Sequence, residues 1–174
     1  SALAGSDVPV AKTWALCEDD SVIGTMFYIM DCVDGRIMWD PSLPGMTPAQ
    51  RGAIFDEMNR VIAAMHRVDY TAVGLADYGK PGQYLERQVA RWSKQYRASE
   101  TEKIEAMDKL IDWLPQNIPA GDETSIVHGD FRLGNLIVGP EGLRAVLDWE
   151  LVHLGDPVED LGWFCVRAWR FGSS

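Results

Sequence analysis

Residues 128–135 read HGDFRLGN, and residues 147–150 read LDWE. Between them, two apolar runs flank the sequence GPEG, which is typical of the turn of a β-hairpin. In such a hairpin Asn135 opens one strand and Asp148 closes its antiparallel partner, so we expect the two side chains at the same end. This stretch therefore predicts a small β-hairpin with polar side chains gathered at its open end.

Three side-chain oxygen donors follow or precede the short apolar runs here: Asp130, Asn135 and Asp148. A carboxylate with an amide suits Mg²⁺, which keeps several waters and takes other ligands from phosphates. Asp130 would then accept a proton from an alcohol, a division of roles that phosphoryl transfer requires. Arg132 would place a cation against the transferred group. Taken singly, each of the three is more typical of a turn, because Asp and Asn beside Gly favour turns, and it is the joint pattern that points to a site.

The composition limits the class of protein. The chain has 174 residues, of which 47% are apolar and 24% charged, as in one packed globular domain. A net charge of −10 argues against a nucleic-acid surface, although a metal and a few donors can still hold a nucleotide. The sequence shows no apolar run of membrane-spanning length and no signal-peptide pattern. We expect a cytoplasmic protein that binds neither nucleic acid nor membrane.

The N-terminal third predicts a β-hairpin followed by a helix. Residues 12–19 and 25–33 are rich in β-favouring residues and are separated by a polar turn. Thr47 is the expected N-cap of a helix that runs to about Arg67, because Gln50 completes a capping box and proline occupies the first helical position.

Further helices are predicted over residues 81–97 and 101–114, and a closing helix is predicted after Asp156 as N-cap. Apolar residues recur in each at helical spacing, so we expect these stripes to face the core. The residues concerned are Leu85, Val89, Trp92, Tyr96, Ile104, Met107, Ile111 and Leu114, with Leu161, Phe164, Cys165 and Ala168 in the closing helix.

The motifs VHGDFRLGNLIV (127–138), AVLDWE (145–150) and GDPVEDLGW (155–163) together resemble the catalytic core of the aminoglycoside phosphotransferase family. That family is related to choline kinases and, more distantly, to protein kinases. Nearly the whole chain is most similar to the phosphotransferase-like domain of acyl-CoA dehydrogenase family members ten and eleven and of bacterial homologues.

The resemblance implies an α+β, protein-kinase-like fold, of which this chain holds a part. Residues 1–35 would form the end of the N-terminal small lobe and the hinge. Residues 36–174 would form the core of a mainly helical C-terminal large lobe, with a small β insert that carries the catalytic loop. The chain is expected to be truncated at both ends relative to the family.

The resemblance also assigns roles to the polar residues of the motifs. Asp130 matches the catalytic base, while Asn135 and Asp148 match the residues that hold Mg²⁺. Arg132 occupies the position at which protein kinases carry a phosphate-contacting lysine, so it is the second candidate catalytic residue.

The resemblance also implies residues that support the catalytic loop and residues that contact the nucleotide. His128 resembles the histidine that buttresses the catalytic loop, and Asp160 resembles the buried aspartate that ties this loop down. The stretch FYIMDCVDG is similar to the last small-lobe strand and hinge. There the backbone of Asp31 and Val33 would hydrogen-bond adenine, with Met30 behind the base.

The sequence thus favours a Mg²⁺-dependent phosphotransferase that moves the γ-phosphate of ATP or GTP to a hydroxyl of a small molecule. The most similar branch suggests a hydroxyacyl-CoA acceptor, and an aminoglycoside is another option. A non-catalytic kinase-like binding or scaffold module is the alternative, because no glycine-rich loop or matching strand lysine precedes the hinge and Lys12 is expected to be exposed. A metal-dependent hydrolase is a third and weaker alternative, because such an enzyme usually has more histidines at its site. His66 and His153 are isolated and are predicted to be ordinary helix-end or surface histidines.

Overall fold

The structure, a computed structural model, describes residues 2–121 and 123–165, except for the side chain of Phe164. Its strands are β1 (Thr13–Cys17), β2 (Phe27–Met30), β3 (Arg36–Ile37), β4 (Ser125–Val127), β5 (Leu136–Gly139), β6 (Gly142–Val146) and β7 (His153–Gly155). Its helices are α1 (Pro48–His66), α2 (Tyr84–Ser99), α3 (Glu105–Trp113) and α4 (Val158–Cys165), with short 3-10 turns η1 (Leu114–Gln116), η2 (Leu133–Asn135) and η3 (Trp149–Leu151).

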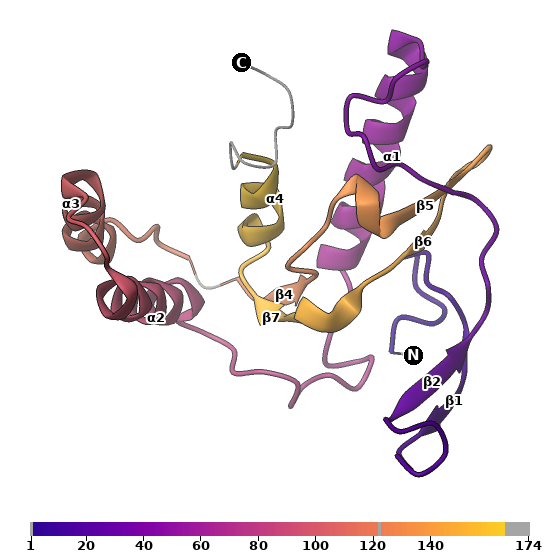
Figure 1. The fold of residues 1–174 in the computed structure, drawn as a ribbon, viewed down its shortest axis with the longest axis horizontal. Coiled ribbons are helices and arrows are strands. Elements are labelled where there is room, and N and C mark those ends of the chain that lie inside the picture. The colour runs from indigo at the N-terminus through magenta and orange to yellow at the C-terminus, as the bar shows by residue number, and fades with distance from the viewer. Residues whose placement is uncertain (1, 122, 166–174) are drawn as a thin grey trace.

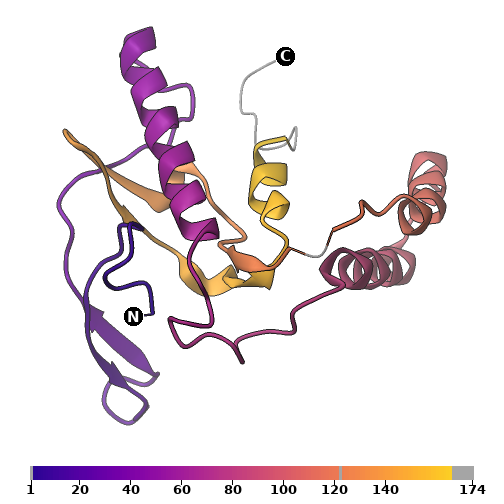
Figure 2. The same ribbon diagram turned by 180° about the vertical axis from the view of Figure 1, so that it is seen from behind.

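Two small antiparallel ladders form the centre of the molecule. The predicted hairpin is present as β5 and β6, with β3 added at its edge, and β4 pairs with β7. Helix α1 lies along the β5–β6 hairpin, and α4 rises from the β4–β7 ladder (Figures 1 and 2). The β1–β2 hairpin and the α2–α3 pair lie at opposite ends of the molecule (Figure 1).

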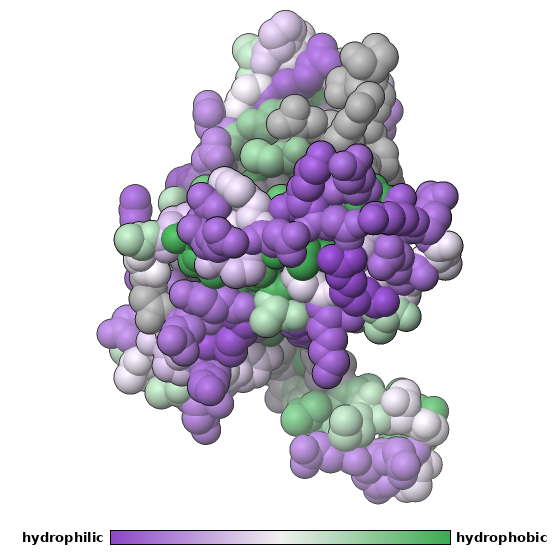
Figure 3. Space-filling model, turned by 90° about the vertical axis from the view of Figure 1, so that its left-hand side faces the viewer, coloured by the Kyte–Doolittle hydropathy of each residue, from purple (hydrophilic) through white to green (hydrophobic). Residues whose placement is uncertain are grey.

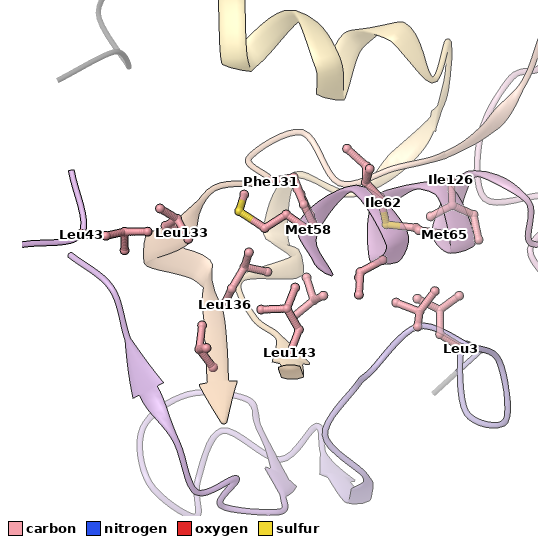
Figure 4. Close-up of a cluster of buried hydrophobic side chains, with 14 of the residues drawn as sticks. Leu3, Leu43, Met58, Ile62, Met65, Ile126, Phe131, Leu133, Leu136 and Leu143 are labelled. Carbon is pink, nitrogen blue, oxygen red and sulfur yellow. The ribbon is translucent and has the colours of Figure 1, made fainter. Parts of the chain in front are cut away.

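Helix α1 begins as predicted. The Thr47 hydroxyl accepts a hydrogen bond from the Gln50 backbone N–H at 3.3 Å, and the Gln50 side chain accepts one from the Thr47 N–H at 2.9 Å. Both bonds satisfy donors that the first turn of a helix leaves unpaired. The helix packs its apolar side on the strands. Its buried side chains form the core together with apolar side chains of residues 126–146 (Figure 4). The buried side chains of α1 are Met58, Val61, Ile62 and Met65.

The N-terminal hairpin is confirmed but is largely uncovered. Strands β1 and β2 pair antiparallel, and their apolar side chains are exposed, including Trp14 at 61% and Tyr28 at 61%. The hairpin projects at the bottom of Figure 3 as a lobe rich in apolar residues. By contrast Leu3 and Val8, which precede it, lie in the core. Residues 2–10 therefore belong structurally with the central body.

The predicted apolar stripes of the second and third helices do not face the core. Helix α2 starts at Tyr84 instead of residue 81, because Gly82 and Gln83 have left-handed backbone angles, and α3 starts at Glu105. Tyr84 is the only buried residue described in α2, and α3 has none. The two helices lie away from the central ladders (Figures 1 and 2), so their apolar faces are only partly covered. Trp92 remains 55% exposed and Ile104 43%.

The closing helix begins near the expected place. The Asp156 carboxylate accepts a hydrogen bond from the Val158 N–H at 2.8 Å, as expected of a residue that begins a helix. The prediction that Leu161 and Cys165 face the core is wrong, because both are exposed. The Phe164 side chain and Ala168 lie outside the described residues. No helix in the described part of the chain has the length and apolar character to cross a bilayer.

Candidate functional site

The loop after β4 brings Asp130 and Asn135 into direct contact. The Asn135 Nδ2 donates to the Asp130 backbone carbonyl at 2.9 Å and to its carboxylate Oδ2 at 2.8 Å. Asn135 is 5% exposed, and its Oδ1 accepts no hydrogen bond from any described residue. The amide is therefore oriented through its nitrogen, and its oxygen is left available to a ligand.

His128 fixes the turn that carries Asp148. The Asp130 N–H donates to His128 Nδ1 at 3.2 Å, so the proton of the neutral ring is on Nε2, which lies 2.9 Å from the Leu147 carbonyl. The Leu147 N–H donates in turn to the Asn135 carbonyl at 2.8 Å. Burial lowers the pKa of His128, which favours this neutral form. Both the N–H and the carbonyl of Leu147 are thus hydrogen-bonded, which fixes the backbone directly before Asp148.

Asp148 is presented to a cavity. It adopts a left-handed backbone conformation with φ 64°, which Asp tolerates better than most residues, and its exposed carboxylate makes no hydrogen bond or ion pair with a described residue. The cavity holds about 810 Å³ between the N-terminal hairpin and the end of β6. Its lining includes Thr13, Tyr28 and Met30 on one side and Val146, Leu147 and Asp148 on the other.

Asp160 anchors the loop from α4. Its carboxylate is fully buried and accepts hydrogen bonds from the backbone N–H groups of His128 at 3.0 Å and Gly129 at 2.9 Å. The Nε2 of His66 lies 2.9 Å from the same carboxylate. Burial alone would raise the pKa of Asp160, but these hydrogen bonds outweigh it and hold the pKa below its ordinary value.

Arg132 forms an ion pair with Asp130 of the same loop. Its Nε is 3.0 Å and 2.9 Å from the two carboxylate oxygens of Asp130. A Cβ built on Gly134 would meet the Arg132 guanidinium at 2.5 Å, so the glycine leaves room for this side chain. The cation and the carboxylate are therefore paired in this structure.

The residues predicted to hold adenine are only partly brought together. Met30 lines the cavity, whereas Asp31 and Val33 do not. The Asp31 N–H donates to the Lys12 carbonyl at 2.9 Å, so only its own carbonyl is available to a ligand. Lys12 is exposed as expected, and its Nζ lies 3.6 Å from the centre of the Trp14 ring.

Sequence reasoning missed several residues that support the loop. His66, predicted to be an ordinary helix-end histidine, is the partner of Asp160 although 94 residues separate them. Trp163 donates from Nε1 to the Gly129 carbonyl. His153, also predicted to be a surface histidine, contacts Tyr84 and Glu159. Helical spacing alone does not indicate such contacts, because each partner comes from a distant element.

No three His, Cys, Asp or Glu side chains in the described part of the chain gather closely enough to hold a metal by themselves. The pair Asn135 and Asp148 offers two oxygens at one end of the hairpin. Such a pair would need water or phosphate oxygens to complete a Mg²⁺ shell.

Relatives known from sequence share this region. Acyl-CoA dehydrogenase family member 10 of Mus musculus is 52% identical over 167 residues, which cover 95% of this chain and 16% of the mouse protein. Acyl-CoA dehydrogenase family member 11 of Homo sapiens is 44% identical over 159 residues, covering 90% of this chain and 20% of that protein. The chain therefore corresponds to a minor part of each relative.

Solved structures show the same fold. A Ralstonia eutropha protein provisionally assigned to the aminoglycoside phosphotransferases superposes with a TM-score of 0.92 at 63% identity, over 99% of this chain and 54% of its own. A variant of the aminoglycoside phosphotransferase APH(4)-Ia, in a ternary complex with ADP and hygromycin B, gives 0.67 at 16% identity, over 93% of this chain and 57% of its own. The expected protein-kinase-like fold is confirmed.

The family follows from the sequence itself. A profile described as the phosphotransferase enzyme family matches residues 1–174, the full length of the chain. This match agrees with the motifs that build the loop around Asp130 and with the superposed structures. The chain belongs to the phosphotransferase enzyme family.

Proposed function

We propose that this chain is the catalytic part of a small-molecule kinase, which transfers the γ-phosphate of ATP or GTP to a hydroxyl group with the help of Mg²⁺. One observation carries the proposal. Asn135, itself a candidate metal ligand, bonds Asp130 through its side-chain amide and bonds Leu147 through its backbone carbonyl, so it links the candidate base to the residue beside the other candidate ligand, Asp148.

Asp130 would act on the acceptor. Its carboxylate would accept the proton of the attacking hydroxyl, or orient that hydroxyl, while Asn135 holds Oδ2 in place. Arg132 would turn from Asp130 toward the phosphoryl oxygens when nucleotide is present, because a transferred phosphoryl group is a stronger attractor for a guanidinium than one carboxylate.

The donor set fits a hard cation. Asn135 has its amide nitrogen engaged, and neither its oxygen nor the Asp148 carboxylate at the cavity has a hydrogen-bonding partner among the described residues. Amide and carboxylate oxygens are the ligands that Mg²⁺ takes from proteins. When bound, the ion would neutralise charge on the nucleotide phosphates. His128 and Asp160 would act as supports of the loop.

The cavity between the N-terminal hairpin and β6 would receive the nucleotide. Its volume of about 810 Å³ lies in the range of small-molecule sites. Met30 would lie behind the base, with the backbone of Asp31 and Val33 as hydrogen-bonding partners. On this proposal residues 1–35 are the end of a small lobe with its hinge, and residues 36–174 are the core of a large lobe.

A non-catalytic binding module is the second candidate. No lysine or arginine is among the described residues that line the cavity, and Lys12 points to Trp14 instead. A site without a cation near the α- and β-phosphates would bind nucleotide weakly and transfer slowly.

An acceptor screen with the full-length protein separates these candidates. ADP formation from ATP or GTP would be followed with Mg²⁺ and a panel of hydroxyacyl-CoAs, aminoglycosides, choline and sugars. Acceptor-dependent ADP formation supports the kinase and identifies the acceptor class. Nucleotide binding in calorimetry with no turnover on any acceptor supports the binding module.

A further inference from the structure

A polar cluster outside the proposed catalytic loop joins α2 to the body of the molecule. The Tyr84 hydroxyl, on the first residue of α2, lies 2.7 Å from His153 Nε2 and donates to the Glu159 carboxylate of α4. The Tyr84 and His153 rings stack with centroids 5.3 Å apart. A Cβ built on Gly155 would meet His153 Nε2 at 2.9 Å and Tyr84 Cε2 at 3.0 Å, so this glycine leaves room for the stack.

The hydrogen bonds of the cluster favour a charged imidazole. His153 Nδ1 lies 2.8 Å from the Leu151 carbonyl, so this nitrogen carries a proton. If Nε2 were bare, the single proton of Tyr84 would have to serve both Nε2 and Glu159. With a proton on Nε2, the histidine donates to the Tyr84 oxygen, and Tyr84 donates to Glu159. Every polar atom then has a partner.

The charges around His153 agree with this state. Glu159 lies 3.5 Å from Nε2, and its hydrogen bond is the main cause that raises the pKa of His153. Asp160, next along α4, adds a weaker attraction. On the α2 side the facing groups are Tyr84, whose pKa is raised by burial and by Glu159, and Arg87, which lies 6.0 Å from the Tyr84 ring.

The cluster adjoins Gly129 of the loop in two ways. The Leu151 carbonyl, which accepts from His153, lies 3.0 Å from the position of a Cβ on Gly129. Glu159 immediately precedes Asp160, whose carboxylate accepts from the Gly129 N–H. A displacement of His153 would therefore change the packing and hydrogen bonding of Gly129, which precedes Asp130 in the chain.

We propose that His153 is a positioning residue of the catalytic loop, which as an imidazolium joins Tyr84 of α2 to Glu159 of α4 and holds the Leu151 carbonyl against Gly129. Deprotonation removes the Nε2 proton and with it the donation to Tyr84, whereas Nδ1 keeps its bond to Leu151, so the positioning is complete at low pH and is weakened as the pH rises through the raised pKa of the folded state. The kinetic consequence rests on the proposed function, whereas the structural consequence does not.

Amide hydrogen exchange on the full-length protein tests the inference without any reaction. We expect His153→Phe, which keeps a ring but no proton, to lower the protection of the His128 and Gly129 amides about tenfold. Tyr84→Phe, which keeps the stack and removes the hydroxyl, should lower it less. Tyr96→Phe is the matched control on the same helix, because the buried Tyr96 hydroxyl makes no hydrogen bond within the described part of the chain. It should leave loop protection unchanged.

The unsubstituted protein provides a second measurement that does not depend on whether the variants fold. After correction for intrinsic exchange, protection of Gly129 should fall as the pH rises above 6.5, the ordinary pKa of histidine, and this fall should be absent in His153→Phe. Loop protection that does not change with pH in the unsubstituted protein overturns the inference. So does loop protection that is the same in Tyr84→Phe, His153→Phe and the unsubstituted protein.

Kinetics add a readout that a purely structural role would not move. We expect kcat to decline with rising pH at constant KM for nucleotide, and His153→Phe to show a low kcat without this decline. A kcat profile identical in His153→Phe and the unsubstituted enzyme contradicts the proposal. If no acceptor is phosphorylated under any condition, the proposed function fails, while hydrogen exchange still decides the role of His153.

Discussion

Asn135 donates from one amide nitrogen to both the backbone carbonyl and the carboxylate of Asp130, at 2.9 Å and 2.8 Å. This contact engages the amide nitrogen of Asn135 and turns its side-chain oxygen away from Asp130. The same residue bonds Leu147 through its carbonyl. One buried residue thus connects the candidate base to the strand end that carries Asp148, through its side chain at Asp130 and through its backbone carbonyl at Leu147.

Replacement of Asn135 should be costly in two distinct ways. Asn135→Ala removes the donor to the Asp130 backbone carbonyl and one of the two donors to its carboxylate, so it should lower the free energy of unfolding by about 1–3 kcal/mol. Asn135→Asp places a second carboxylate where the amide now lies 2.8 Å from Asp130, so the variant should recover stability as the pH falls and one proton is shared. Urea unfolding at several pH values measures both. The exposed Asn59→Ala is the control, and equal stability of all three variants would refute the contact's importance.

Asp148 should link nucleotide binding to Mg²⁺. Asp148→Asn tolerates the left-handed backbone and removes the charge, so we expect stability to change little. In titration calorimetry of the full-length protein, Mg²⁺ should tighten ATP binding at least about tenfold in the unsubstituted protein and much less in this variant. Asp112→Asn, an exposed aspartate on α3, is the control. A variant that keeps the full Mg²⁺ effect would remove Asp148 from the metal site.

Asp160 should contribute to stability in a pH-dependent manner. Asp160→Asn removes a buried charged acceptor of three hydrogen bonds and should cost about 3 kcal/mol at neutral pH. Because the pKa of Asp160 is lowered in the folded state, its contribution is complete above pH 3.8 and is lost as the pH falls below that value. The difference between the two proteins in urea unfolding should therefore shrink on acidification. A constant difference would show that the charge is not responsible.

Two glycines should respond to alanine with opposite signs. Gly129 has φ +80°, and a Cβ there would lie 3.0 Å from the Leu151 carbonyl, so Gly129→Ala should destabilise the protein by about 2 kcal/mol. Gly52 lies within α1 with open space around it, so Gly52→Ala should stabilise by about 0.5–1 kcal/mol. Thermal unfolding compares the two. If Gly129→Ala proves neutral, the catalytic loop is not constrained at this point.

Local signals in the sequence predicted the parts of the structure that depend on neighbours in the chain. The capping box of Thr47 and the turn at GPEG each specify their geometry within a few residues, and both are present. The prediction that Asn135 and Asp148 share one end of the hairpin follows from antiparallel pairing, and Leu147 is indeed bonded to Asn135. The resemblance supplied the kinase-like fold.

Contacts between distant elements were not predictable in this way. Residues 84–114 show amphipathic patterns, yet the stripes on α2 and α3 remain partly exposed because periodicity does not say whether another element covers a face. His66 and His153 have no motif around them, and their roles appear only when α1 and β7 meet α4. Strand β7, with three residues, is too short to give a periodic signal.

Phosphorus NMR of the full-length protein with ATP, Mg²⁺ and the acceptor found by screening tests the central claim most directly. The unsubstituted protein should convert the γ-phosphate signal into that of a phosphate ester and ADP. Asp130→Asn should reduce the rate at least about a hundredfold while nucleotide still binds. A phosphate ester formed at an undiminished rate by Asp130→Asn, or bound ATP that no acceptor ever consumes, would contradict the account.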